Sequence, residues 1–381
     1  MKRIEHPLFA QSLGSQKNLV SFQFGEPDAR PKVYIQASLH AEELPGMLVA
    51  HHLRSFLKRA ESEGRLQGQV VLVPAANPIG LSQRIDHHAQ GRFEFGTSEN
   101  FNRHYPDMAE AVWPLTHARM GPDAAANVAV VRSAMGAWLE QWLVATELES
   151  LRRHLMILSH DADLVLDLHC DCESVMHMYC EEPCWPALEP LARLLDCRAV
   201  LLAKDSGGGP FDERLSGVWW QLQDRLKKAG VDVPLSQACA STTVELRGEG
   251  EVSHPLALKD AQAIMAFLEH ATVLRSHDTT APALPPLACR ATPLAGSQTL
   301  RSARPGVLVY LVNPGQTVVE GEVIAEIIDP TSPEDSSVHQ VKAGVAGVLY
   351  AVIRERYVMA GGEIGKIAGV HPFRTGDLLG A

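Results

Sequence analysis

The sequence predicts an α/β fold over residues 1–285, followed by a small all-β domain over residues 290–381. From Val33 onward, short runs of β-branched and apolar residues alternate with segments that have helical spacing. A proline-rich segment, residues 277–289, then has the composition of a linker. Beyond it, short β-rich runs separated by glycines show no helical periodicity. These three observations favour two domains, and 381 residues can supply more than one core.

The elements of the first domain are expected in alternation. Val33 begins a buried strand that leads into a helix over 44–60. The long loop 81–107 is rich in polar, glycine and aromatic residues, and a loop of this length is often functional. The first 30 residues give few periodic cues. The remaining strands are expected at 69–75, 163–169, 175–179, 199–203 and 241–246, and the helices at 127–152, 185–195, 217–228 and 256–274. In the second domain the β runs are 306–310, 318–328 and 344–353.

Composition excludes several classes of protein. Hydrophobic residues make up 46% and charged residues 21%, which is typical of a globular protein rather than a disordered one. A net charge of -11 argues against nucleic-acid binding. No apolar stretch is long enough to span a bilayer, and the N-terminus lacks the apolar segment of a secretory signal. We therefore expect a protein without nucleic-acid or membrane partners.

Seven cysteines in a chain without a signal favour reduced thiols and a cytoplasmic location. Four of them cluster and raise the alternative of a structural zinc: Cys170, Cys172, Cys180 and Cys184. Their spacing is not the paired CxxC of zinc ribbons. Packing of small apolar side chains around a strand is therefore the favoured interpretation.

His40 and Glu43 stand where the first strand turns into its helix. Side chains at this place can point into the crevice at the carboxyl ends of the strands, where open α/β folds bind ligands. A catalytic zinc site usually takes three protein ligands. His169 ends a later strand and is the natural third ligand. Asp167, on the same face of that strand, could orient a ligating imidazole or simply tie a loop.

Zinc-dependent hydrolysis also needs a base for the attacking water. Glu245 is the candidate, because a glutamate in an apolar strand is costly unless it faces a site or a partner. The alternative is a salt bridge with Arg247.

Guanidinium groups bind carboxylates and developing oxyanions, and the long loop offers three: Arg84, Arg92 and Arg103. Asn102 stands beside the last of them. Each arginine taken singly is more simply a surface charge. Because three of them lie on one ordered-looking loop between the strands that carry the predicted metal ligands, a binding role is about as well supported as a surface role.

Five motifs resemble, in order, those of the succinylglutamate desuccinylase/aspartoacylase family of the zinc carboxypeptidase-like superfamily: HAEE at 40–43, NPIG at 77–80, ENFNRHYPD at 99–107, DLH at 167–169 and VEL at 244–246. The resemblance covers roughly residues 30–275. It implies a zinc-carboxypeptidase-like catalytic domain, with a mixed sheet and helices on both faces. It also implies a small appended β-barrel or sandwich, which residues 290–381 match.

The resemblance assigns roles residue by residue. His40, Glu43 and His169 are similar to the zinc ligands, and Glu245 to the general base. Asn102 and Arg103 resemble the pair that grips the substrate carboxylate, and Arg92 resembles the oxyanion-stabilising arginine, with Arg84 as the alternative for that role. Ala41 replaces a glycine that is frequent in relatives. The C-terminal domain resembles biotinyl/lipoyl-type barrels, but its expected hairpin tip, 329–337, has no lysine to modify.

These observations lead to one hypothesis with two competitors. The hypothesis is a cytoplasmic hydrolase with one zinc ion per chain, which cleaves the amide bond of a small N-acyl amino acid or N-acyl amine. The nearest competitor is a zinc carboxypeptidase acting on short peptides or cell-wall fragments. The other is a non-catalytic protein that binds a metabolite or recruits a partner. The sequence leaves the acyl group, the amine and a homo-oligomeric state open.

Overall fold

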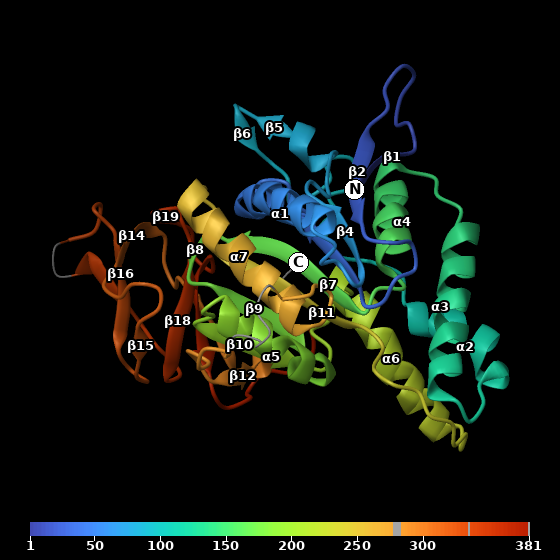
Figure 1. Cartoon of the computed structure of the whole chain (residues 1–381). Coiled ribbons are helices and arrows are strands. Elements are labelled where there is room, and N and C mark those ends of the chain that lie inside the picture. The colour runs from blue at the N-terminus through green and yellow to red at the C-terminus, as the bar shows by residue number, and fades with distance from the viewer. Residues whose placement is uncertain (277–282, 334–335, 380–381) are drawn as a thin grey trace.

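The computed structural model describes residues 1–276, 283–333 and 336–379. A nine-stranded sheet forms its centre, in the order β1-β2-β4-β3-β7-β11-β9-β10-β12 (Figure 1). Its strands are β1 (Lys2–Pro7), β2 (Asn18–Phe24), β3 (Lys32–Ala37), β4 (Gln69–Val73), β7 (Leu164–Asp171), β9 (His177–Glu181), β10 (Ala199–Ala203), β11 (Ala240–Gly248) and β12 (Ala291–Pro293). The sheet is mixed, because β3 pairs in parallel with β4 and β7 while β9 runs antiparallel to β11.

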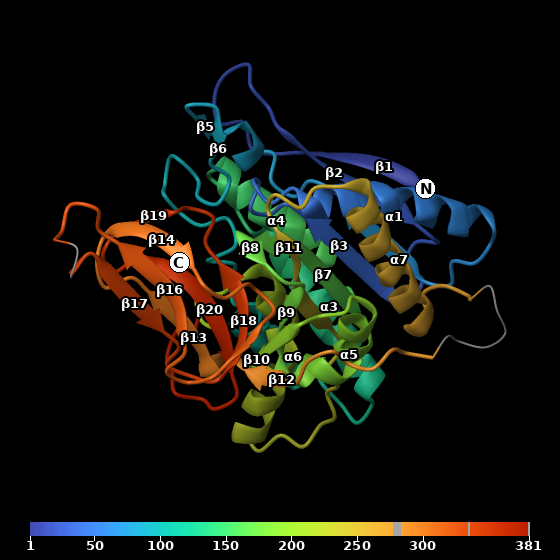
Figure 2. The ribbon, with the colours of Figure 1, turned by 90° about the vertical axis from the view of Figure 1, so that its left-hand side faces the viewer.

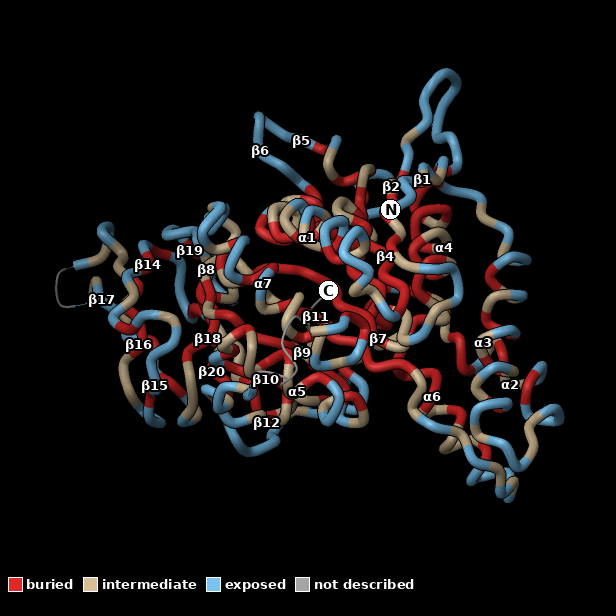
Figure 3. The backbone as a smooth tube through the Cα atoms, viewed as in Figure 1, coloured by how far each residue is buried: buried red, intermediate tan, exposed pale blue. Residues whose placement is uncertain are grey.

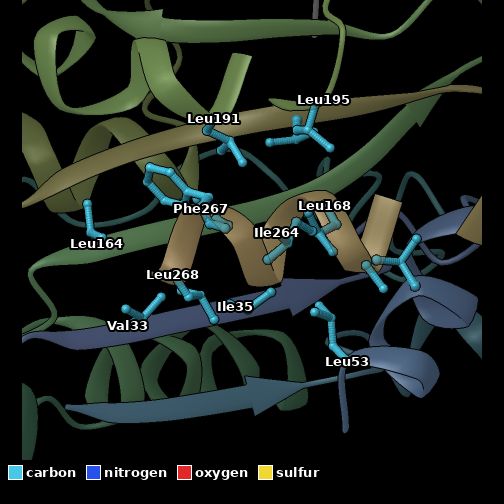
Figure 4. Packing of buried hydrophobic residues seen from close by; sticks show 14 of the residues in the cluster. Val33, Ile35, Leu53, Leu164, Leu168, Leu191, Leu195, Ile264, Phe267 and Leu268 are labelled. Carbon is cyan, nitrogen blue, oxygen red and sulfur yellow. The ribbon is translucent and has the colours of Figure 1, made fainter. Parts of the chain in front are cut away.

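Helices cover both faces of this sheet, as expected. One face carries α1 (Pro45–Ser62), α5 (Trp185–Leu194) and α7 (His254–His270); the other carries α2 (Met108–Thr116), α3 (Ala124–Gln141), α4 (Glu147–Ser159) and α6 (Phe211–Lys228). Short 3₁₀ helices lie at Gly80–Ser82, His117–Arg119, Glu182–Cys184 and Leu294–Gly296. Alternation along β3 explains the two layers, since Val33 and Ile35 join the first apolar cluster and Tyr34 joins the second. Figure 4 shows the first cluster between the sheet and α7.

The single helix predicted over residues 127–152 is wrong, because the structure has two helices there, α3 and α4. Trp142 ends α3 with an extended backbone. Thr146 then caps α4: its hydroxyl accepts from the amide of Glu149, and the Glu149 carboxylate accepts from the amide of Thr146. This capping box fixes a new helix start.

The N-terminal hairpin of β1 and β2 was not predicted. β1 is an edge strand whose residues are exposed or half-buried, so it lacks the apolar alternation that marks a strand. Helix α6 also differs, since it begins at Phe211 rather than at the predicted Gly217.

The C-terminal strands lie beside the carboxyl end of β7 (Figures 1 and 2). They form a sheet of β13 (Ser297–Arg301), β20 (Glu363–Gly369), β18 (Gly347–Val352) and β15 (Thr317–Val318), and a second of β17 (Val338–Lys342), β16 (Val323–Ile328), β14 (Gly306–Tyr310) and β19 (Tyr357–Val358). One apolar cluster is shared by both sheets. We call residues 297–379 the C-terminal β region.

Two pairings join this part of the chain to the rest. β12 extends the large sheet beside β10, and β8 (Glu173–Ser174) pairs with β18. The predicted linker and hairpin tip lie partly outside the described residues, and a domain boundary between residues 285 and 290 stays a prediction. Buried backbone is concentrated in the central sheet (Figure 3). None of the helices within the described ranges has the length and apolarity needed to cross a membrane.

Candidate metal centre and catalytic cavity

His40 and Glu43 lie in the short turn between β3 and α1. The amide of Glu43 donates to the carbonyl of His40 (3.1 Å), so both side chains leave one tight turn. Gly46, in the first turn of α1, lets this helix approach β7, because a Cβ there would lie 3.0 Å from the Leu168 carbonyl oxygen. The parallel pairing of β3 with β7 then brings the next residue, His169, beside the turn.

The Glu43 carboxylate lies between two imidazoles. Its Oε1 is 2.8 Å from His40 Nδ1 and its Oε2 is 2.7 Å from His169 Nδ1. The amide of Cys170 also donates to Oε2 (3.1 Å). The three side chains are buried, and their ligand atoms all lie within 4.8 Å of one another. The structure therefore brings together the three residues that the sequence predicts as metal ligands.

The outer nitrogen of each imidazole faces a side chain that fixes the ring. His40 Nε2 lies 2.9 Å from Asn100 Oδ1, and His169 Nε2 lies 3.1 Å from Asp167 Oδ2. Asp167 is held in turn, since its Oδ1 accepts a hydrogen bond from the side-chain Nε2 of Gln36 (2.9 Å). Carboxylates and amides behind ligating histidines set the ring orientation and the basicity of the ligand. Both histidines thus have the supporting contacts of metal ligands.

The charges in this cluster also suit a divalent cation. Burial, followed by the charge of Arg92, lowers the pKa of His40 to about 4, so its imidazole is neutral at pH 7. Burial opposes ionisation of Glu43, but His169 and His40 outweigh it and hold the pKa of this carboxyl well below its usual range. Burial is likewise outweighed at His169, whose pKa is raised by Asp167 and Glu43. A metal ion held by His40, Glu43 and His169 would displace the proton on the His169 nitrogen that faces Glu43, while Asp167 would keep the proton on the other nitrogen. A donor set of two imidazoles and one carboxylate fits zinc.

Glu245 lies on β11 directly opposite His169 of β7. Its Oε2 atom is buried and has no hydrogen-bond partner among the described residues. Burial, followed by repulsion from Glu43, raises the pKa of Glu245 to about 8. Arg247 does not neutralise it, because that guanidinium pairs with Asp260 instead. Glu245 is therefore a carboxyl group poised beside the cluster, with a pKa close to neutrality.

The cluster opens into a cavity of about 510 Å³. Arg92, Asn102, Arg103 and Glu245 all line it. Arg92 reaches the predicted metal ligands, with Nη1 3.3 Å from Glu43 Oε1. Asn102 is fixed by the amide of Phe211, at the start of α6, which donates to its Oδ1 (2.9 Å).

Arg84 is not brought to the cavity. It lies exposed on β5 (Arg84–Ile85), which forms a small hairpin with β6 (His88–Ala89), and its guanidinium donates to the carbonyl of His87 (3.4 Å). Of the three arginines on the long loop, Arg92 and Arg103 line the cavity and Arg84 does not.

Sequence reasoning missed two sets of residues. The first is Asn100, which contacts His40. It lies two positions before Asn102 within the motif ENFNRHYPD, so its place in that motif could have marked it as a site residue. The second set comes from the C-terminal β region and forms a wall of the cavity; it includes Ser297, Thr299, Arg301, Tyr350, Lys366 and Arg374. No motif marks these residues.

The cysteines form no second centre in the described part of the chain. All seven are free thiols, and none belongs to the cluster of possible metal ligands, which consists of His40, Glu43 and His169. Cys180 and Cys184 are buried in the first apolar cluster, in agreement with a packing role, whereas Cys170 is buried outside it and Cys172 is half-buried.

The chain is similar to one family model and to several solved structures. The model of the succinylglutamate desuccinylase/aspartoacylase catalytic domain matches residues 29–271. A solved structure of a protein of that family from Shewanella amazonensis is 25% identical, with a TM-score of 0.84 over 97% of this chain and 98% of that chain. A second, from Shewanella frigidimarina, is 24% identical, with a TM-score of 0.82 over 97% of each chain.

A more distant likeness concerns the product-bound ectoine utilization protein EutE (DoeB) of Ruegeria pomeroyi. It is 15% identical, with a TM-score of 0.66 over 97% of this chain and 95% of that chain, so it shows the shared fold alone. No curated protein matches the sequence significantly.

Proposed function

Because the chain belongs to the succinylglutamate desuccinylase/aspartoacylase family, we propose that it is a zinc-dependent hydrolase of small N-acyl amino acids or N-acyl amines. One observation carries the proposal. Two imidazoles and a carboxylate converge in a buried cluster, and Glu245, whose pKa is raised to about 8, lies opposite His169 on the neighbouring strand. Metal ligands with an adjacent carboxyl group are the elements of metal-assisted hydrolysis.

His40, Glu43 and His169 would hold one zinc ion, which supplies a Lewis acid for the scissile carbonyl and lowers the pKa of water. Glu245 accepts the proton of the attacking water and then gives it to the leaving nitrogen. The proton balance closes, because the carboxylate ends each cycle as it began. A pKa near neutrality suits a group that must both take and return a proton.

Two arginines have different tasks in this proposal. Arg92, beside the metal ligands, faces the place where negative charge develops on the carbonyl oxygen. Arg103 and Asn102, which also line the cavity, bind a carboxylate of the substrate. Arg84 takes neither role, since it lies outside the cavity.

A comparison of two arginine variants tests this division. Arg92→Gln should lower kcat about 100-fold to 1000-fold, as loss of an oxyanion donor does in other hydrolases. Arg84→Gln is the matched control, because it removes the same group from the same loop outside the cavity. Equal losses in both variants, or none in Arg92→Gln, would remove Arg92 from the mechanism.

A substrate panel tests the proposed reaction itself. The zinc-loaded enzyme should release free amines from N-acyl amino acids and leave dipeptides intact, as measured by amine detection. Turnover of dipeptides alone would favour a carboxypeptidase. Tight binding of a metabolite without turnover of any compound would favour a non-catalytic protein.

Glu245→Gln tests the proposed base. The variant should keep its zinc and lose at least about 100-fold in kcat, because an amide side chain cannot accept the proton.

The partner in this proposal is a small N-acylated molecule, without nucleic acid or membrane. We place the enzyme in the cytoplasm, and the seven free thiols support this location.

A further inference from the structure

The C-terminal β region supplies a charged side chain to the catalytic cavity. Lys366, on β20, lines the cavity and donates from Nζ to Asp171 Oδ2 (2.6 Å). Asp171 is on β7, two residues beyond His169. Arg356 also reaches across to β8, where it pairs with Glu173 (2.7 Å), but it does not line the cavity.

Hydrogen bonds to residues of β7, β11 and α6 place Lys366 and the segment of Asn102 and Arg103 toward opposite ends of the predicted metal ligands. Opposed residues along β7 and β11 are Asp167 and Thr243, His169 and Glu245, and Asp171 and Gly248. At the Thr243 end, the Thr243 hydroxyl donates to Asp212 (3.1 Å). The amide of Phe211, the residue before Asp212, donates to Oδ1 of Asn102, the residue before Arg103 (2.9 Å). Lys366 contacts Asp171, at the other end of the same series. A molecule lying across the metal ligands therefore extends toward Arg103 at one end and toward Lys366 at the other.

The Lys366 ammonium has hydrogen-bonding capacity left for a ligand. It carries three N–H bonds, and Asp171 accepts one. Glu363 Oε1 is 3.7 Å away, which is beyond hydrogen-bond distance. Within the part of the chain that the structure describes, no other oxygen accepts from Nζ. Burial opposes the charge, but Asp171 outweighs it and raises the pKa of Lys366, so the ammonium stays protonated.

The surroundings of Lys366 are also polar. Ser297, Thr299 and Arg301 line the same wall from β13. The guanidinium of Arg374 donates to the backbone carbonyls of Ser297 (3.3 Å) and Leu378. An aliphatic chain against this wall would exclude water from the ammonium without offering it an acceptor, which is unfavourable.

We propose that Lys366 is a specificity-determining residue that donates a hydrogen bond to an oxygen on the acyl half of the substrate. The acyl group then carries a hydroxyl, carbonyl or carboxylate oxygen beyond the scissile amide. This inference rests on the proposed function, which assigns Arg103 to the carboxylate of the amine half and so leaves the acyl half for Lys366. It makes the C-terminal β region part of the substrate-binding site.

An acyl series of constant length tests the proposal. The substrates are N-butyryl, N-4-hydroxybutyryl and N-succinyl derivatives of one amino acid, which offer no oxygen, a neutral oxygen and an anionic oxygen at the far end. For the wild type, kcat/KM should be about tenfold or more higher with an oxygen-bearing acyl group than with butyryl. The two oxygen-bearing substrates separate a neutral acceptor from a charged one. In Lys366→Met the ratio of oxygen-bearing to butyryl substrate should fall to about one.

Each ratio is measured within one enzyme preparation, so partial loss of folded protein cancels. Arg356→Met is the matched control, because it breaks a contact between the same two parts of the protein outside the cavity, and it should keep the wild-type ratio. A wild-type ratio in Lys366→Met would overturn the proposal, as would a wild type that does not prefer the oxygen-bearing groups.

Calorimetry separates failure of this inference from failure of the hydrolase proposal. Succinate or 4-hydroxybutyrate should bind the wild type more tightly than butyrate, and Lys366→Met should abolish the difference. This pattern without hydrolysis of any amide would contradict the hydrolase and support Lys366 as a ligand-binding residue. Hydrolysis without this pattern would contradict the role of Lys366 alone.

Discussion

Single hydrogen bonds behind the predicted metal ligands orient the side chains of the cluster. Each histidine directs one nitrogen toward Glu43 and the other toward a supporting side chain, Asn100 for His40 and Asp167 for His169. Asp167 is completely buried and is held by Gln36. Such contacts fix the orientation of both imidazoles before a metal binds.

The contact between Asp167 and His169 leads to a prediction about zinc affinity. Asp167→Asn keeps the size of the side chain but removes the charge that makes His169 a stronger ligand. Zinc should bind about 10-fold to 100-fold more weakly, as measured by competition with a chromogenic chelator. Asp161→Asn is the control, since Asp161 pairs with Arg30 and Lys32 away from the cavity. Unchanged affinity in Asp167→Asn would show that this carboxylate does not support the ligand.

Glu245 leads to a prediction about pH in the metal-free protein. Its pKa is raised to about 8 in the folded state, from the usual 4.5. Between these values the unfolded chain releases the proton and the folded chain keeps it, so the free energy of unfolding falls as pH rises. Glu245→Gln has no titrating carboxyl group at this position and therefore lacks this pH-dependent loss of stability. In urea titrations with excess chelator, the variant should gain stability relative to the wild type at pH 8 but not at pH 5. The same difference at both pH values would contradict the raised pKa.

At the level of elements, apolar runs predict most of the central sheet and its covering helices. β3, β4, β7, β10 and β11 are buried along most of their length, and short runs rich in β-branched and apolar residues mark them. The break between α3 and α4 is harder to see, because apolar residues continue through Trp142 and only the capping box at Thr146 signals a new helix. β1 is missed for the opposite reason, since its side chains are largely exposed and carry no apolar pattern.

The capping box gives a prediction about the start of α4. Thr146→Ala removes the hydroxyl that accepts from the Glu149 amide, so the free energy of unfolding should fall by about 1 kcal/mol in a urea titration. Ser55→Ala serves as the control, because Ser55 is exposed in the middle of α1 and alanine favours a helix interior. A Thr146→Ala variant as stable as the wild type would mean that α4 is positioned by packing alone.

In the whole molecule, residues far apart in the sequence meet at one place. The sequence predicts the meeting of His40 and His169, because neighbouring parallel strands present their carboxyl ends at the same edge of a sheet. It does not predict the wall formed by Lys366 and its neighbours. That wall depends on how the C-terminal β region docks, through the pairing of β8 with β18 and the bond between Lys366 and Asp171. Long-range docking of this kind has no local pattern in the chain.

The central claim is that His40, Glu43 and His169 jointly hold one metal ion, and elemental analysis of purified variants tests it most directly. The wild type and Glu245→Gln should contain about one zinc per chain, and His40→Ala and His169→Ala should contain almost none. His51→Ala, which removes an exposed histidine of α1, should keep its zinc. Full zinc content in His40→Ala or His169→Ala would contradict the account.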